Sequence, residues 1–296
     1  MSDQVEVFDS HEAKVGQLTV RRALPRRQLR TIGAWCFADH MGPAEVTETS
    51  GLDIGPHPHT GLKTVTWLVD GAVLHRDSLG SEQVIRPDQL NLMTAGHGVV
   101  HAEEATDTYR GTLQGVQLWV AQPEGTRHGP AAFAHHADLP RAEIGVAEVT
   151  VLAGTFAGAT SPALFDTALV GVDAVINPGH LTWELDPTFE YAVIALEGQV
   201  RVGEAIARPG QIAVLGTDRQ EIGVEALGRS RLLLLGGVPF PETLVMWWNF
   251  VARDRAEISA AVAQWRDGDG RFGEVDSRLL RIPSPVPPWP PGTTAA

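Results

Sequence analysis

The chain has 296 residues, of which 43% are hydrophobic and 20% are charged. This composition is typical of a folded globular protein of about two domains, and it excludes disorder except at the ends. The formal net charge of -13 repels phosphate backbones and anionic lipid, so neither direct nucleic-acid binding nor a membrane partner is expected. Cys36 is the single cysteine, which excludes an internal disulfide and a zinc site built from several thiolates.

The N-terminal segment is polar and acidic and has no apolar core of a signal peptide. No stretch of the chain approaches about 18 uninterrupted apolar residues, the length of a membrane span. Since a lone thiol also suits a reducing compartment, we expect a cytoplasmic protein.

Short runs of β-forming residues, separated by Gly, Pro and Asp, occupy most of the chain and predict strands. They are residues 64–69, 83–85, 90–94, 115–121, 148–154, 168–176, 190–196, 211–215 and 231–235. A helix is predicted over residues 253–266, where Ile258, Val262 and Trp265 share one face. The proline-rich residues 283–296 predict a disordered tail.

An internal repeat indicates the architecture. Residues 86–93 and 208–215 share the pattern Arg-Pro-x-Gln followed by alternating aliphatic residues, 122 positions apart. Residues 70–73 and 197–200 also match, 127 positions apart and in the same order. These offsets predict two tandem copies of one β-domain, with the boundary near residues 137–147.

Histidine is concentrated in the first copy, because ten of the 11 histidines lie at or before position 136. Two pairs are each separated by one residue: His57 with His59, and His101 with Glu103. Residues i and i+2 of a strand face the same side, so two facing strands can bring both pairs to one point. Three imidazoles and one carboxylate suit a divalent transition metal such as Fe(II), Mn, Ni, Cu or Zn.

Three neighbouring residues offer alternatives. Glu104 is a second candidate carboxylate, but its odd spacing from His101 turns it to the opposite face of the strand. His97, between two glycines, is a candidate for lining the pocket. His75 is expected to be a hydrogen-bonded barrel residue rather than a fifth ligand.

The spacing of Gly51, His57, His59 and Gly71 fits the first sequence motif of the cupin superfamily, and Gly96 with His101 fits the end of the second. More specifically, the segments at 56–65, 93–103 and 115–120 resemble the signature segments of the pirin family. The segment Met-Trp-Trp-Asn-Phe at 246–250 indicates a bacterial branch of that family.

The resemblance implies a mainly β fold of two tandem cupin barrels, of the double-stranded β-helix or jelly-roll kind, with a C-terminal helix. It implies an N-terminal metal-binding barrel at 1–140, a C-terminal barrel without metal at 141–282 and the tail at 283–296. It also implies that His57, His59, His101 and Glu103 hold one divalent transition metal. Fe(II) is the metal we expect, and Mn, Ni, Cu or Zn are the alternatives.

The repeat argues against a second metal. A shift of His57 and His59 by 122 positions lands near His180 and Thr182, and the matching segment 220–225 contains no histidine. Within the first copy, Lys63 stands where pirins typically carry an acid, so Glu103 is left as the carboxylate ligand.

Pirins include enzymes of the quercetinase type, so the resemblance implies a dioxygenase that acts on a small aromatic substrate with O2. In that reading Glu103 is also the catalytic base that takes the proton of a flavonol hydroxyl. The alternative is a metal-dependent regulatory protein that binds a metabolic protein partner without turnover. A third reading is a cupin isomerase or lyase that acts on a sugar or a small acid.

Overall fold

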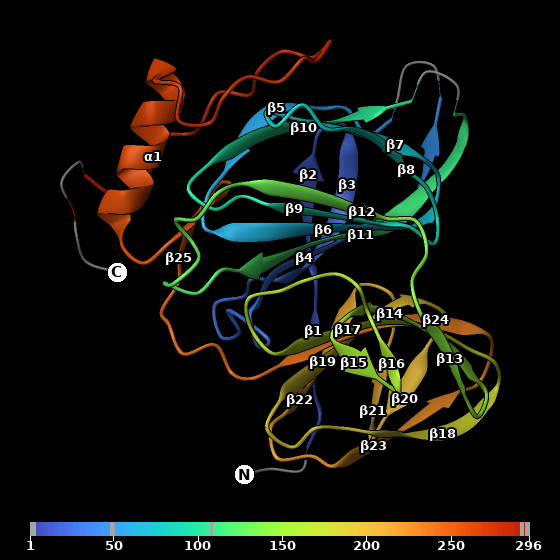
Figure 1. Cartoon of the computed structure of the whole chain (residues 1–296). Helices are drawn as coiled ribbons and strands as arrows, with labels where there is room; N and C mark the ends of the chain where they lie inside the picture. The colour runs from blue at the N-terminus through green and yellow to red at the C-terminus, as the bar shows by residue number, and fades with distance from the viewer. Residues whose placement is uncertain (1–3, 48–50, 107–108, 291–292, 294–296) are drawn as a thin grey trace. The chain divides into compact units, whose positions relative to one another are not determined.

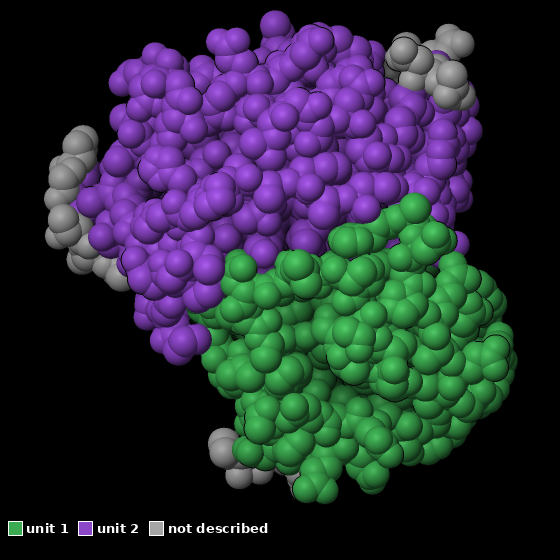
Figure 2. All heavy atoms as spheres, in the orientation of Figure 1, with its two compact units in different colours: residues 1–13, 20–40, 136–240 green, residues 14–19, 41–135, 241–296 purple. Residues whose placement is uncertain are grey.

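The computed structural model describes residues 4–47, 51–106, 109–290 and 293 (Figure 1). The chain forms two compact units, coloured separately in Figure 2. The first barrel comprises residues 14–19, 41–135 and 241–296, and the second barrel comprises residues 1–13, 20–40 and 136–240.

Two antiparallel sheets build the first barrel. The four-stranded sheet has the order β5 (Ile54–His59), β10 (Val99–Ala105), β7 (Val73–Asp77) and β8 (Glu82–Ile85). The seven-stranded sheet has the order β12 (Ala132–His136), β9 (Leu90–Thr94), β6 (Leu62–Asp70), β11 (Gly111–Ala121), β4 (Trp35–Val46), β3 (Leu18–Leu24) and β2 (His11–Val15). A hairpin of β25 (Val245–Trp247) and β26 (Phe250–Ala252) follows late in the chain.

The second barrel repeats this plan. Its seven-stranded sheet has the order β1 (Glu6–Asp9), β22 (Gln211–Gly216), β19 (Glu190–Glu197), β24 (Ser230–Gly237), β17 (Leu169–Ile176), β14 (Ala147–Ala153) and β13 (Arg141–Ile144). Its four-stranded sheet has the order β18 (Gly179–Glu184), β23 (Glu221–Ala226), β20 (Val200–Val202) and β21 (Ala205–Ala207). A short hairpin joins β15 (Thr155–Phe156) and β16 (Ala159–Thr160).

The two barrels share one topology, which confirms the mainly β fold of tandem cupin barrels. The strand order β5-β10-β7-β8 recurs as β18-β23-β20-β21, and β9-β6-β11-β4 recurs as β22-β19-β24-β17. The repeated Arg-Pro-x-Gln pattern forms the same turn in each: the backbone N–H of Arg86 and that of Arg208 each donate to the glutamine side chain three residues later, at 3.0 Å. The residue after proline has positive φ in both turns, 66° at Asp88 and 87° at Gly210. The internal repeat is therefore also a repeat of local conformation.

The predicted helix is α1 (Arg255–Asp267). Its N-terminus is capped by the Asp254 side chain, which accepts from the backbone N–H of Glu257 at 2.8 Å, and it ends at Gly268 in the left-handed conformation. Its buried face packs against apolar residues of the first barrel: Val100, Phe250 and Phe272. Within the described part of the chain, no helix has the length and apolarity needed to cross a membrane.

The units are discontinuous in sequence, which differs from the contiguous barrels expected at 1–140 and 141–282. At the N-terminus, β1 pairs with β22 of the second barrel, from Glu6 opposite Val214 to Asp9 opposite Gln211. At the other end, residues 241–296 return to the first barrel, because the face of α1 is buried there. Strand pairing and helix packing, rather than sequence order, therefore set the boundaries.

The proline-rich tail also differs from expectation. Ser284 is buried, and the ring of Trp289 lies 5.7 Å from that of Trp247 in a T-shaped contact. The Trp289 Nε1–H donates to Ser259 Oγ of α1 at 3.1 Å. Residues 291–292 and 294–296, which the expected disorder also covered, lie outside the described residues. Proline prevents regular secondary structure here, but it does not prevent an aromatic side chain from docking.

This docking predicts a stability effect. Trp289→Ala removes the ring contact and the hydrogen bond to Ser259, and we expect it to lower the free energy of unfolding by about 1–2 kcal/mol, less than a fully buried aromatic residue would cost. Val286→Ala, at an exposed position of the same tail, is the control and is expected to change it little. Urea unfolding measures both, and equal values for the two variants would contradict a docked tail.

Candidate metal centre

Three histidines of the first barrel converge inside it. His57 and His59 lie on β5 and His101 lies on β10, where it pairs directly with His57. All six residues of β5 are buried. One ring nitrogen from each histidine lies within 4.8 Å of the others, and within the described residues this is the one group of three or more candidate ligands that meets so closely. The three imidazoles therefore converge on one point, as the spacing of the histidines predicted.

Backbone carbonyls determine which ring nitrogen of two histidines is free. His57 Nδ1 lies 2.8 Å from the carbonyl oxygen of Gly55, and His59 Nδ1 lies 3.0 Å from that of Asn249. A carbonyl oxygen only accepts, so each Nδ1 carries the hydrogen and donates it. In the neutral rings, each Nε2 is left with a lone pair.

Burial keeps these rings neutral, which is the form that binds metals. It lowers the pKa of His57 to about 4, with an opposing contribution from the Gly55 carbonyl. It holds the pKa of His59 and of His101 well below the ordinary value, and the neighbouring histidines lower both further. The three neutral imidazoles can therefore bind a metal without first releasing a proton.

The donor set fits a divalent transition metal. His59 Nε2 lies 3.1 Å from His101 Nε2, and the ring centroids of His57 and His101 are 4.3 Å apart. Two imidazole nitrogens that face each other at this distance need either a shared hydrogen or a cation between them. Neutral imidazole is a preferred ligand of Zn, Cu, Fe and Ni, whereas Mg and Ca prefer oxygen.

Glu103 lies on the same strand but outside this close group. The pairing of β10 with β5 shifts between His101, opposite His57, and Glu103, opposite Ile54, so β5 has one extra residue there. The side chain is buried, and burial raises the pKa of Glu103, with smaller opposing contributions from the neighbouring His75 and from a hydrogen bond with Thr66. The role of Glu103 as a fourth ligand stays a prediction.

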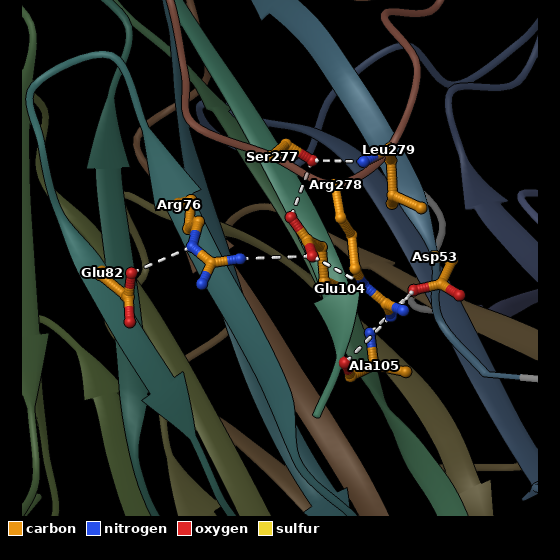
Figure 3. Close-up of polar contacts among 8 residues, drawn as sticks. All are labelled: Asp53, Arg76, Glu82, Glu104, Ala105, Ser277, Arg278 and Leu279. Atoms are coloured by element: carbon orange, nitrogen blue, oxygen red, sulfur yellow. Dashed lines mark hydrogen bonds and ion pairs between the residues drawn. The ribbon is translucent and has the colours of Figure 1, made fainter. Parts of the chain in front are cut away.

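Glu104 is engaged on the other face of β10, as its spacing predicted (Figure 3). Its carboxylate accepts from Ser277 Oγ at 2.7 Å, from Arg278 Nε at 3.0 Å and from Arg76 Nη1 at 3.3 Å. Arg278 also donates to Asp53 Oδ1 at 2.9 Å. Glu104 is therefore a buried carboxylate at the centre of an ion-pair network that joins β7 and β10 to a late segment of the chain.

That late segment also supports the strand that carries His57 and His59. The backbone N–H of Ile282 donates to the carbonyl oxygen of Pro56 at 2.9 Å. A side chain at Gly55 would place its Cβ 2.1 Å from the carbonyl oxygen of Leu280, so glycine permits this close approach. Residues far apart in sequence thus fix the backbone beside the imidazoles.

His97 lies in a separate place. It lines a cavity of about 260 Å³ together with Arg127, Glu257 and Arg271, and none of the four predicted ligands lines that cavity. The structure does not bring His97 to the histidine cluster. Its role in lining a substrate pocket stays a prediction.

The second barrel has an apolar interior at the equivalent positions. On β18, Leu181 and Trp183 are buried, whereas His180 and Thr182 are exposed. Trp183 packs with Phe156 in a core of Val, Ala and Leu side chains. His180 therefore points away from the interior of this barrel, and the expectation of one metal per chain stays a prediction.

Sequence reasoning missed some of the residues that surround the cluster. Trp119 on β11 sets its ring at 76° to that of His59, with centroids 5.1 Å apart. Asn249, which supplies the carbonyl for His59, is 190 residues away in sequence. Asp77 contacts His75, and His75 contacts His101. The separation of His75 and Asp77 by one residue on a strand could have indicated that these two side chains lie on the same face.

Known proteins resemble the chain over most of its length. A family model described as Pirin matches residues 17–120, and one described as Pirin C-terminal cupin domain matches residues 172–273. A Pseudomonas aeruginosa protein named "Putative quercetin 2,3-dioxygenase" is 46% identical over 93% of this chain and 87% of its own length. A "Pirin-like protein" of Caulobacter vibrioides is 36% identical over 91% of this chain and 96% of its own.

Solved structures of related proteins share the fold of this chain. The crystal structure of quercetin 2,3-dioxygenase from Acinetobacter baumannii has a TM-score of 0.93 and 44% identity, and the match covers 96% of each chain. A bacterial pirin from Escherichia coli, solved in complex with nickel(II), shares the fold with a TM-score of 0.64 and 16% identity, over 80% of this chain and 100% of that one.

The cluster predicts metal content. A double substitution, His57→Ala with His101→Ala, removes two of three converging imidazoles and is expected to yield a folded protein without bound metal. His180→Ala, at an exposed position of the second barrel, is the control and is expected to keep about one metal per chain. Elemental analysis of purified protein measures both, and near-stoichiometric metal in the double variant would refute this centre.

The two adjacent glutamates predict different defects. Glu104→Gln removes the charge that Arg76 and Arg278 contact, and we expect a loss of about 1–3 kcal/mol in the free energy of unfolding with metal retained. Glu82→Gln is the matched control: Glu82 also pairs with Arg76 but is exposed, so little change is expected. Loss of metal without loss of stability in Glu104→Gln would reverse the assignment.

Proposed function

The chain belongs to the pirin family, and from this premise we propose that it is a metal-dependent dioxygenase of the quercetin 2,3-dioxygenase type, which opens the flavonol ring with O2. The observation that carries the proposal is the buried cluster of His57, His59 and His101, with a buried Glu103 on the same strand. Relatives named as quercetin dioxygenases support an oxidoreductase of this kind.

His57, His59, His101 and Glu103 are the residues that we propose hold the metal. A bound divalent metal would supply a Lewis acid for the flavonol oxygen and, where the metal is redox-active, as Fe is and Zn is not, electron transfer with O2. Fe(II) is our choice, with Mn, Ni, Cu or Zn as alternatives, because imidazole ligands suit Fe, Ni, Cu and Zn and a carboxylate ligand suits Mn.

Glu103 is the residue that we propose takes the proton of the flavonol 3-hydroxyl. Burial raises the pKa of this carboxyl, which makes its carboxylate a stronger base. His75 lies opposite Glu103 across the β10–β7 pairing. A buried base beside the metal-binding histidines can take a proton from the substrate without exchanging it with water.

Aromatic side chains support the choice of a flat substrate. Trp119 is largely buried and presents its ring to His59, and Phe133 stacks on His75 at 4.5 Å with an interplanar angle of 14°. Apolar and aromatic walls with a few polar groups are typical of sites for aromatic small molecules. These contacts also exclude water from the imidazoles.

A single substitution tests the base. Glu103→Gln preserves shape and one oxygen but removes the charge, so oxygen uptake with quercetin is expected to fall by about 10²- to 10⁴-fold at matched metal content. Glu221→Gln, exposed on β23, is the matched control and is expected to behave as the wild type. Oxygen consumption and metal content are measured on the same samples.

Two results would count against the proposal. Equal turnover of Glu103→Gln and wild type at equal metal content would show that Glu103 is not the base. A fully metallated wild type that consumes no oxygen with any flavonol would contradict the proposed dioxygenase activity. The protein would then be better described as a metal-dependent regulatory protein without turnover.

A further inference from the structure

His75 connects the histidine cluster to a carboxylate. It lies on β7 and is 4% exposed, with one face stacked on Phe133. Its Nδ1 lies 3.4 Å from His101 Nδ1, and its Nε2 lies 3.1 Å from Asp77 Oδ2. Both ring nitrogens of His75 are thus engaged by buried side chains, one of them from the cluster itself.

The direction of each hydrogen bond follows from Asp77. Its Oδ1 accepts from the backbone N–H groups of Leu79 at 2.9 Å and Ser81 at 3.0 Å, which fixes the orientation of the carboxylate. A carboxylate only accepts, so the His75 Nε2–H donates to Oδ2. In the neutral ring, His75 Nδ1 then has a lone pair, and the hydrogen between the two Nδ1 atoms belongs to His101.

His101 differs in this respect from the other two histidines. Backbone carbonyls hold the Nδ1–H of His57 and His59, whereas His101 faces a group that can be either donor or acceptor. If His101 carried its hydrogen on Nε2, it could donate to His59 Nε2 at 3.1 Å and close the cluster with a hydrogen bond. The tautomer of His101 therefore decides whether the Nε2 atoms of all three histidines have a lone pair available for a metal.

We propose that His75 and Asp77 are positioning residues that hold His101 as its Nδ1–H tautomer and thereby commit His101 Nε2 to a divalent metal. The inference rests on the metal centre of the proposed function, but not on turnover. Groups that orient ligating histidines commonly raise metal affinity by about 10- to 100-fold. Here the orienting group is a second histidine, itself oriented by a carboxylate that two backbone N–H groups hold in place.

Asp77→Asn tests the direction of the chain of hydrogen bonds. The N–H groups of Leu79 and Ser81 retain the amide oxygen, so the amide NH2 faces His75 Nε2, which must then accept. His75 would carry its hydrogen on Nδ1, and His101 would have to place its own on Nε2. We expect the affinity of the metal-free protein for Ni(II), measured by calorimetry, to fall by about 10- to 100-fold.

An isosteric pair at His75 separates hydrogen bonding from packing. His75→Asn keeps an oxygen near the position of Nδ1 that can accept from His101, and it is expected to bind Ni(II) within a few-fold of the wild type. His75→Leu has nearly the same shape and no acceptor, and we expect it to lose affinity as Asp77→Asn does. Both variants lose the stacking on Phe133, so packing affects them alike.

Three outcomes would overturn the proposal: wild-type affinity in Asp77→Asn, equal losses in His75→Asn and His75→Leu, or no Ni(II) binding by the wild type. Thermal unfolding of each variant reports whether it is folded. If Asp77→Asn does not fold, the pair at His75 alone decides. A wild type that binds Ni(II) but lacks dioxygenase activity in any metal form would contradict the proposed reaction and leave this inference standing.

Discussion

The candidate metal centre of the first barrel depends on the burial of three neutral imidazoles whose free nitrogens face one another. Each ring must have its outer Nδ1–H accepted, because an unpaired buried donor would cost about 1–3 kcal/mol. Two backbone carbonyls and one side chain lie at the required positions, from Gly55, Asn249 and His75. The irregular pairing of β5, the hairpin that carries Asn249 and the loop after β7 all hold one of these acceptors in place.

The two barrels show how one topology separates stability from chemistry. In the second barrel, residues such as Trp183, Val172 and Leu234 fill the interior, and each fully buried apolar side chain of this size contributes about 1.5–3 kcal/mol. In the first barrel, part of that interior is occupied by histidine and glutamate, which contribute far less hydrophobic stabilisation. The ion-pair network of Glu104 and the docked C-terminal segment add contacts around the same strands.

Adjacent positions on β10 illustrate how strand alternation divides roles. Glu103 and Glu104 are both buried acids, but Glu103 faces the surroundings of His75 whereas Glu104 contacts Arg76, Ser277 and Arg278. The difference follows from the two-residue period of a strand. Of these two adjacent glutamates, Glu104 thus stabilises the attachment of the C-terminal segment, whereas Glu103 is the proposed fourth metal ligand.

The sequence by itself determined the features that local periodicity controls. The β class, the repeated Arg-Pro-x-Gln turn, the helix around Ile258 and Trp265, and the convergence of His57, His59 and His101 all follow from spacings of two to four residues or from an internal repeat. Only the tertiary structure decided the rest. Asn249 and His75 became partners of the cluster, Trp289 docked on α1 and the units became discontinuous, because each depends on contacts between residues far apart in the chain. The place of Glu103 outside the close group follows from an extra residue in β5, an irregularity that alternation alone does not reveal.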